Sequence, residues 1–256
     1  MTEAKTHIIR FFEQNLRFDG RKLDELRKVE IQTGVTKNAE GSARVKIGET
    51  EVIAGVKMSV ETPYPDTPDD GNMIINVELL PLSSPEFEAG PPNVVSIEIA
   101  RITDRSIRES KAIDTKKLCI EPAKKVWAVS IDIATINNDG NLIDASALAA
   151  IAAIRDTRFP SYEDGVVNYK KLTEERIPIK KLPVTVTINK IGKYYFVDSS
   201  YDEEPLIEAR LTAGVTKEGN VCALQKGGSG LLSEDEVSEM LRLAIDKSRE
   251  LGREIN

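Results

Sequence analysis

The sequence predicts an α+β fold in which helices cover the faces of two β-sheets. Segments with alternating apolar and polar residues, such as residues 124–137, indicate strands. Residues 93–113 instead repeat their apolar side chains at the spacing of a helix. The predicted order is helix, strands, helix, strand, helix, linker, strands and helix. Such grouped strands and helices are typical of α+β or mixed α/β proteins.

The first block of elements covers the N-terminal 158 residues. An amphipathic helix is expected in residues 1–15, with His7 on it, and an Asp-Gly pair at residues 19–20 marks a turn. Strands are expected at residues 27–35, 41–49, 50–60, 73–82 and 124–137. The proline-rich segment 61–72 is expected to be a loop. Helices are expected at residues 93–113, where Val95, Ile99, Ile102 and Ser106 share one face, and after Asp139-Gly140 up to about Arg158.

The second block follows a polar, proline-containing segment that we interpret as a linker. Strands are expected at residues 184–192, 193–200, 208–217 and 220–226. The closing helix begins with a capping box formed by Ser233 and Glu236. The predicted organisation is an N-terminal helix and loop (1–28), a first domain (29–160), a linker (161–182) and a second domain (183–256).

The composition excludes several classes of protein. With 40% apolar and 30% charged residues the chain is predicted to be globular, and no apolar run approaches the roughly 20 residues of a membrane helix. Its two cysteines, Cys119 and Cys222, are far apart, which favours a reducing cytoplasm. The single histidine, His7, excludes Ser-His-Asp and Cys-His catalysis within one chain. A net charge of −7 argues against indiscriminate binding to nucleic acid but permits a local basic stripe.

Three arginines share one side of the helix expected at residues 93–113. Arg101, Arg105 and Arg108 cluster there at ~100° per residue, and guanidinium groups suit phosphate oxygens. Such a row could follow a single-stranded nucleic acid backbone. The spacing alone favours a solvated face instead, with Asp104 and Glu109 as ion-pair partners within the helix.

Two other segments could carry chemistry. The segment "VDSSYDEEP" places four carboxylates near a strand end, which could bind Mg²⁺ or act as a general acid: Asp198, Asp202, Glu203 and Glu204. The glycine-rich loop from Gly227 to Gly230 could cradle an anion before the last helix. For both segments the ordinary alternative, an acidic turn and a flexible connector, is favoured.

The segment "DGNLIDASALAAIAA" predicts a glycine turn followed by a helix of small side chains. The free N–H groups at a helix N-terminus attract anions. Leu142 and Ile143 stand where an arginine could hold a phosphate. The residues alone leave open whether this is an anion site or only a packed helix.

Seven segments in order resemble the RNase PH family, most of all the non-catalytic ring subunit of archaeal exosomes. These segments are "RFDGRKLDELR", "GSARVKIGETEVIAGVK", "PYPDTPDDGNMIINVELLPL", "FEAGPPN", "EIARITDRSIRES", "LCIEPAKKVWAVSIDI" and "NNDGNLIDASALAAIAAI". The resemblance implies a ribosomal-protein-S5-domain-2-like β-α-β N-terminal domain and a smaller β-α C-terminal domain. It also implies 3′-to-5′ degradation of RNA by phosphorolysis, with no cofactor and no metal expected in this chain.

The resemblance gives "DGNLIDASALAAIAA" a more specific meaning. Active members hold phosphate at an Asp-Gly turn that is followed by a Ser or Thr, an Arg and Thr-Ala. Asp139, Gly140 and Ala145 match that pattern, whereas Leu142 and Ile143 replace the hydroxyl and the arginine. An aliphatic side chain cannot neutralise phosphate. We therefore expect that this chain lacks its own phosphorolytic site.

Two further expectations follow from the resemblance. Asp198 matches the first member of the family's acidic pair, while the catalytic Asp position holds Glu204. Arg101 and Arg105 match arginines that contact RNA, whereas Arg108 could serve RNA or subunit contact. The implied partners are a catalytic RNase PH-like subunit in a hexameric ring (a trimer of heterodimers), RNA-binding cap subunits and single-stranded RNA, with no membrane. The alternatives are an active phosphate-dependent exoribonuclease that uses the Gly227–Gly230 loop and, least favoured, a metal-dependent hydrolase.

Overall fold

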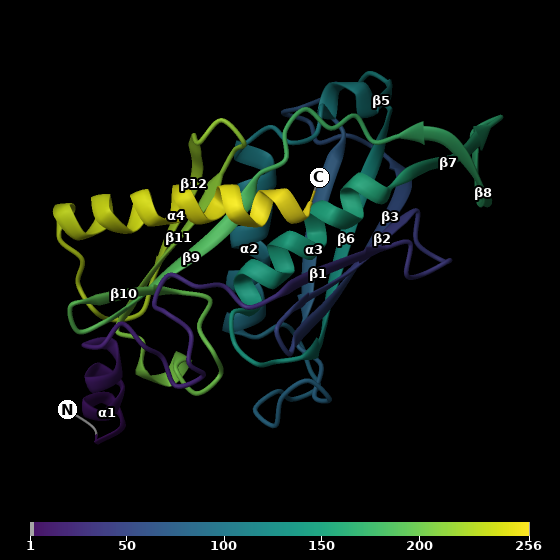
Figure 1. Cartoon of the computed structure of the whole chain (residues 1–256). Coiled ribbons are helices and arrows are strands. Elements are labelled where there is room, and N and C mark those ends of the chain that lie inside the picture. Colours follow the sequence, from purple (N-terminus) through teal and green to yellow (C-terminus); the bar gives the residue numbers. More distant parts are fainter. Residues whose placement is uncertain (1–2, 256) are drawn as a thin grey trace.

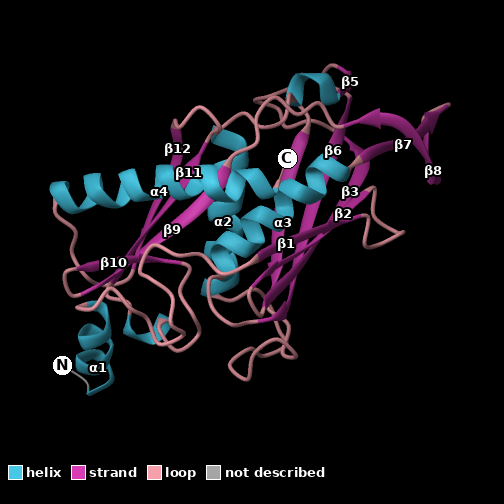
Figure 2. Ribbon diagram, in the orientation of Figure 1, coloured by secondary structure: helices cyan, strands magenta, loops and turns pink. Residues whose placement is uncertain are grey.

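The computed structural model describes residues 3–255 and has the expected mixed α+β organisation, with two sheets and helices between and outside them (Figures 1 and 2). The helices are α1 (Glu3–Phe12), α2 (Val94–Glu109), α3 (Leu142–Asp156) and α4 (Glu234–Glu254). Two short 3₁₀ turns are η1 (Thr115–Leu118) and η2 (Glu204–Leu206). The fold class predicted from the sequence is confirmed.

The first sheet contains the N-terminal strands in the order β1-β2-β3-β6-β4, with the short β5 beside one end of β6. Its strands are β1 (Val29–Thr33), β2 (Gly41–Ile47), β3 (Thr50–Glu61), β4 (Asn72–Glu78), β5 (Cys119–Glu121) and β6 (Lys125–Asn137). Neighbouring strands are antiparallel, except that β4 runs parallel to β6. β4 is an edge strand because it stands at the end of this order. The helix that follows it, α2, packs against it.

The second sheet has the order β10-β9-β11-β12, and all its pairings are antiparallel. Its strands are β9 (Val184–Ile191), β10 (Tyr194–Val197), β11 (Ala209–Val215) and β12 (Val221–Gly227). β9 is buried along nearly its whole length because α3 contacts it as well as α4. The helices α2 and α3 thus lie between the two sheets, and α4 lies against the second sheet (Figure 1).

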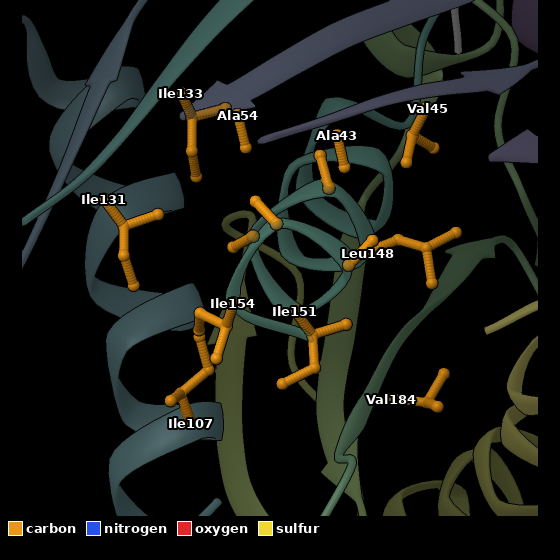
Figure 3. Close-up of a cluster of buried hydrophobic side chains, with 14 of the residues drawn as sticks. Ala43, Val45, Ala54, Ile107, Ile131, Ile133, Leu148, Ile151, Ile154 and Val184 are labelled. Atoms are coloured by element: carbon orange, nitrogen blue, oxygen red, sulfur yellow. The ribbon is translucent and has the colours of Figure 1, made fainter. Parts of the chain in front are cut away.

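The small side chains of α3 allow this helix to lie between two sheets. Twelve of its fifteen residues are buried, and six of the twelve are alanines. Leu148, Ile151 and Ile154 fill the space between the alanines and reach toward both sheets (Figure 3). The first sheet approaches closely: a Cβ on Gly41 of β2 would lie 2.6 Å from the Ala153 carbonyl oxygen. Alanine at these positions keeps the helix propensity high while the neighbouring strands pack tightly.

The segment expected to be a linker contains a β-hairpin. The strands β7 (Arg158–Glu163) and β8 (Val166–Arg176) pair antiparallel and extend away from the two sheets (Figure 2). The connecting residues Asp164 and Gly165 have φ values of 52° and 81°, as a two-residue type I′ turn requires. The Asp-Gly pair was the sequence signal for this hairpin, but the surrounding polar residues concealed it. The domain limits at residues 160 and 183 stay a prediction.

The N-terminal segment packs on the second sheet rather than on the first. Ile8 and Phe12 of α1 form a small separate core with Ile191 and Phe196 of β9 and β10. Val95 is 48% exposed, whereas Ile99, Ile102 and Ser106 do form the buried face of α2. Among residues 3–255, no helix is long and apolar enough to span a bilayer.

The tight packing of α3 leads to a testable expectation. Ala149 is fully buried, so Ala149→Leu must displace neighbouring side chains and is expected to reduce the free energy of unfolding by about 1–3 kcal/mol. Ala4→Leu in α1, at an exposed position, is the matched control and should change stability by less than about 0.5 kcal/mol. Urea unfolding followed by circular dichroism measures both. Equal stability of the two variants would contradict the packing described for α3.

Candidate functional site

The arginines of α2 lie on the side of the helix that faces away from the core. Asn93 caps the helix, since its side-chain oxygen accepts a hydrogen bond from the Ser96 N–H at 2.9 Å. Arg101, Arg105 and Arg108 are all exposed, as their spacing predicted. They differ in their partners, however, and this difference separates Arg108 from the other two.

Arg108 is engaged within the protein. Its guanidinium pairs with Asp104 one turn earlier, with 2.7 Å between Nη2 and Oδ1, and also donates to the Met73 carbonyl at 3.1 Å. The Asp104 hydrogen bond raises the pKa of Arg108 further above its usual value. In the described part of the chain, neither Arg101 nor Arg105 has a carboxylate partner. The predicted ion pair within the helix thus forms at Arg108, while Arg101 and Arg105 present their charges to solvent.

Arg101 and Arg105 border a groove of about 510 Å³ between α2 and β4. The opposite wall contains Ile75, Asn76 and Val77 of the edge strand β4. A groove with two guanidinium groups on one wall and an apolar strand on the other suits a chain that carries both phosphates and bases. The structure therefore brings the two arginines together at one surface groove, which Asp104 also lines.

The glycine turn before α3 has the backbone that the sequence indicated. Gly140 has a φ of 82°, and a Cβ there would lie 2.4 Å from the Ser199 carbonyl oxygen, so only glycine fits. The next residue, Asn141, is also left-handed, with a φ of 59°. Leu142 is buried, and Ile143 lies half-buried at the edge of a pocket of about 460 Å³ between the starts of α2 and α3 and the second sheet. Neither side chain can hold a phosphate.

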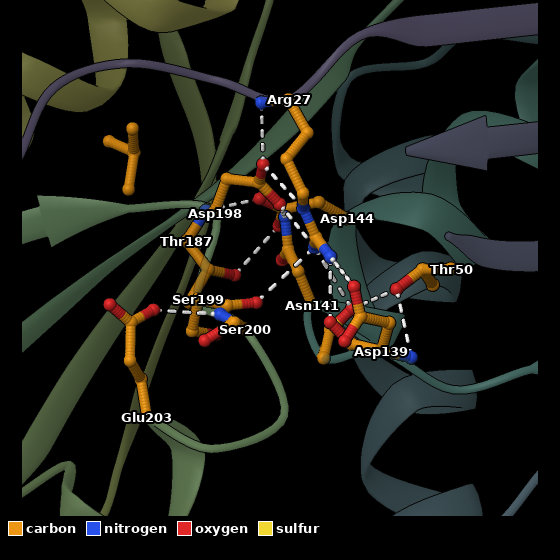
Figure 4. A network of polar contacts seen from close by, with 12 residues as sticks. Arg27, Thr50, Asp139, Asn141, Asp144, Thr187, Asp198, Ser199, Ser200 and Glu203 are labelled. Atoms are coloured by element: carbon orange, nitrogen blue, oxygen red, sulfur yellow. Dashed lines mark hydrogen bonds and ion pairs between the residues drawn. The ribbon is translucent and has the colours of Figure 1, made fainter. Parts of the chain in front are cut away.

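A largely buried arginine side chain supports this turn from the N-terminal segment. Arg27 donates from Nε and Nη2 to the two Asp198 carboxylate oxygens at 2.9 and 2.7 Å (Figure 4). Its Nη1 donates to the Asp139 carbonyl at 2.7 Å, and its Nη2 also approaches the Gly140 carbonyl at 3.3 Å. Burial lowers the pKa of Arg27, but Asp198 and Asp139 outweigh this effect and raise it. Each nitrogen of the guanidinium thus already donates a hydrogen bond to an oxygen of the protein.

The four carboxylates of "VDSSYDEEP" have separate roles rather than one shared site. Asp198 is completely buried and bonds to Arg27, Arg21 and the Asn141 side chain. Burial raises the pKa of Asp198, yet the hydrogen bonds and charge of Arg27 hold it below its usual value. Glu203 pairs with the buried Arg17, and Asp202 is exposed. Within residues 3–255, no three metal-ligating side chains gather into a possible metal site.

Glu204 reaches back to the start of α3. Its Oε1 accepts a hydrogen bond from the backbone N–H of Asn141 at 2.8 Å and lies 3.4 Å from the Ser199 hydroxyl. The residue as a whole is exposed, while desolvation of its carboxyl raises the pKa of Glu204 and the Asn141 and Ser199 contacts act in the opposite direction. Glu204 therefore contacts the residue that immediately precedes α3.

The Gly227–Gly230 loop packs against Glu208 and does not form an open cradle. The Gly230 N–H donates to the Glu208 carbonyl at 2.7 Å, and a Cβ on Gly228 would lie 2.5 Å from the same oxygen. These glycines permit close backbone packing. His7 is exposed on α1 and contacts the rings of Phe11 and Phe18.

Sequence reasoning missed one polar residue at this site. Asp144 is buried in the first turn of α3, and its carboxylate accepts hydrogen bonds from the Thr187 N–H at 3.0 Å and the Thr187 hydroxyl at 2.7 Å. Burial raises the pKa of Asp144 to about 7. A lone acid among the apolar residues of "LIDASALAAIAA" was the available signal. Asp144 joins α3 to β9 and thereby the two halves of the chain.

The family comparisons match both halves of the chain. The model for domain 1 of the 3′ exoribonuclease family, RNase PH, matches residues 25–160, and the model for domain 2 matches residues 181–247. The chain belongs to the RNase PH family. The resemblance inferred from the seven sequence segments is confirmed. In this RNase PH-family chain, Asp139, Leu142 and Ile143 lie in the first matched region, and Asp198 and Glu204 in the second.

Similar proteins of the RNase PH family come from archaeal exosomes. The exosome complex component Rrp42 of Methanothermobacter thermautotrophicus is 46% identical over 92% of this chain and 88% of its own length. A chain of the Archaeoglobus fulgidus exosome, solved with RNA bound to the active site, is 46% identical and superposes with a TM-score of 0.92 over 99% of this chain and 98% of that one. A chain of an archaeal exosome core is 43% identical, with a TM-score of 0.87 over 98% and 96%.

Asp144 generates a pH-dependent expectation. Its folded pKa of about 7 lies above the ordinary value of 3.8, so the folded chain binds a proton between these values and loses stability as the pH rises through this interval. Asp144→Asn removes the titrating carboxyl and with it this pH dependence of the free energy of unfolding. Relative to wild type, the variant should gain up to about 1.4 kcal/mol per pH unit between about pH 5 and 7.

Urea unfolding at pH 5, 6, 7 and 8 measures this difference. Asp202→Asn, which removes an exposed carboxylate, serves as the control and should follow the wild-type profile. Parallel stability profiles for Asp144→Asn and wild type would contradict a raised pKa at Asp144.

Proposed function

We propose that this chain is a catalytically inactive, RNA-contacting subunit of an archaeal exosome ring. The single observation that carries the proposal is the turn before α3, where Gly140 and Asn141 are left-handed and the following Leu142 and Ile143 provide no group to bind phosphate. The relatives named as exosome components support the assembly. The ring would alternate this chain with a catalytic RNase PH-like partner as a trimer of heterodimers, in the cytoplasm.

The environment of the acidic residues also supports inactivity. Asp198 is saturated by two arginines and an asparagine side chain, so it has no capacity left to accept a proton from a substrate. A lowered pKa makes it a weaker base still. In this proposal the chain positions RNA and completes the ring, and RNA-binding cap subunits dock on the assembled core.

Inactivity is tested with the purified chain, poly(A) and inorganic phosphate. We expect no release of nucleoside diphosphate from the chain alone, and release once the chain is reconstituted with a catalytic partner. The mass of the co-purified complex reports the ring. Diphosphate release by the isolated chain that persists through repurification would instead support the alternative, an active phosphate-dependent exoribonuclease.

The groove between α2 and β4 is the proposed RNA contact, through Arg101 and Arg105. Changing both to Gln in the assembled ring removes two positive charges without adding repulsion. We expect weaker RNA binding and a salt dependence reduced by about 0.7 in log–log slope for each lost phosphate contact. Fluorescence anisotropy at several salt concentrations measures both quantities.

The matched control changes Arg242 and Arg253 of α4 to Gln, because both are exposed and lie outside the groove. This pair alters the net charge equally and should leave the slope unchanged. Equal slopes for the two double variants would remove Arg101 and Arg105 from the RNA-binding surface. Arg108→Gln is expected to have little effect on the slope, because Asp104 already neutralises this arginine.

A further inference from the structure

The helix α3 begins without a cap from its own turn. The helices α2 and α4 are each capped by a side chain just before their first residue, Asn93 and Ser233. At the same position of α3, the Asn141 side chain makes no capping bond, because it donates to Asp198 at 2.9 Å instead. The start of α3 therefore depends on another group for compensation of its N-terminal dipole.

The carboxylate of Glu204 supplies that group. Its Oε1 sits 2.8 Å from the Asn141 N–H, although the two residues are 63 positions apart in the chain. The 3₁₀ turn η2 begins at Glu204, and Glu204 and Ile143 line the same pocket. The Glu204 carboxyl group thus already lies beside the N–H of Asn141, immediately before the first residue of α3.

Among residues 3–255, the arginines near this turn already have carboxylate partners. Arg27 is saturated by Asp198, Asp139 and backbone carbonyls, and Arg210 on the far side of the pocket pairs with Glu98. A phosphate dianion at the start of α3 would consequently meet the Glu204 charge at short range, without a free arginine. Replacement of Ile143 by arginine would supply the missing cation, but the Glu204 carboxyl group would still lie where phosphate would bind.

We propose that Glu204 is a resident anion that excludes inorganic phosphate from the start of α3. This inference rests on the proposed function and deepens it: phosphate is excluded because its position is occupied, in addition to lacking the arginine. Glu204 is accordingly a specificity-determining residue of this subunit. Its replacement should be required before any arginine at position 143 can recruit phosphate.

The test compares phosphate binding by four variants of the full chain: Ile143→Arg alone, and the same change combined with Glu204→Ala, Glu204→Gln or Asp202→Ala. Isothermal titration with phosphate gives the affinity, and the amide ¹⁵N shift of Asn141 locates the binding. We expect Ile143→Arg with Glu204→Ala to bind at least tenfold more tightly than Ile143→Arg alone. The Glu204→Gln combination removes the charge but can keep the hydrogen bond, and should gain less.

Asp202→Ala is the matched control, because it removes an exposed carboxylate two residues away and should give no gain. Thermal unfolding of each variant verifies the fold, and the near-isosteric Glu204→Gln variant protects the test against loss of the cap. Equal affinity of Ile143→Arg with and without Glu204→Ala, including no binding by either, would overturn the inference. Failure of the proposed function is read separately, as turnover by the wild-type chain.

Discussion

The ion pair between Arg27 and Asp198 is the interaction on which the arrangement of the site depends. It joins three segments that are distant in the sequence: the N-terminal segment that contains Arg27, the turn before α3 and the end of β10. Asp198 has a φ of 49°, so the chain bends sharply at the residue that carries the buried charge. Burial of two charges is costly, and the pair persists because every polar atom of it is hydrogen bonded. A buried network with several bonded members favours one geometry over others.

The strands and helices could be predicted from the sequence because their patterns are local. The alternation in residues 124–137 and the small residues after Asp139-Gly140 correspond to β6 and α3. The β7–β8 hairpin was not predicted, because charged residues dominate a two-stranded arm with little apolar surface to bury. Val95 fits the helical period of α2, but it is the second residue of the helix and is 48% exposed, so a shared face did not by itself determine burial.

The site was only partly predictable for a different reason. The exposure of Arg101 and Arg105 follows from the period of α2, and Gly140 follows from the turn. Neither the Arg17–Glu203 pair nor the Glu204 contact to Asn141 has a local signature, since their members are separated by 186 and 63 residues. The acidic segment therefore resembled a possible metal site, although folding brings arginines from the N-terminal segment onto two of its four carboxylates.

The position of α2 and α3 between the sheets makes the two matched regions share one interior. A single cluster of buried apolar residues contains Val45 and Ile131 from the first sheet as well as Val186 and Leu211 from the second. A hinge between the regions would have to expose this shared interior to water, at a cost that grows with the apolar area opened. The two sheets are consequently joined by one apolar core. In an assembly, a displacement of one sheet, or of the groove between α2 and β4, would therefore displace the other sheet as well.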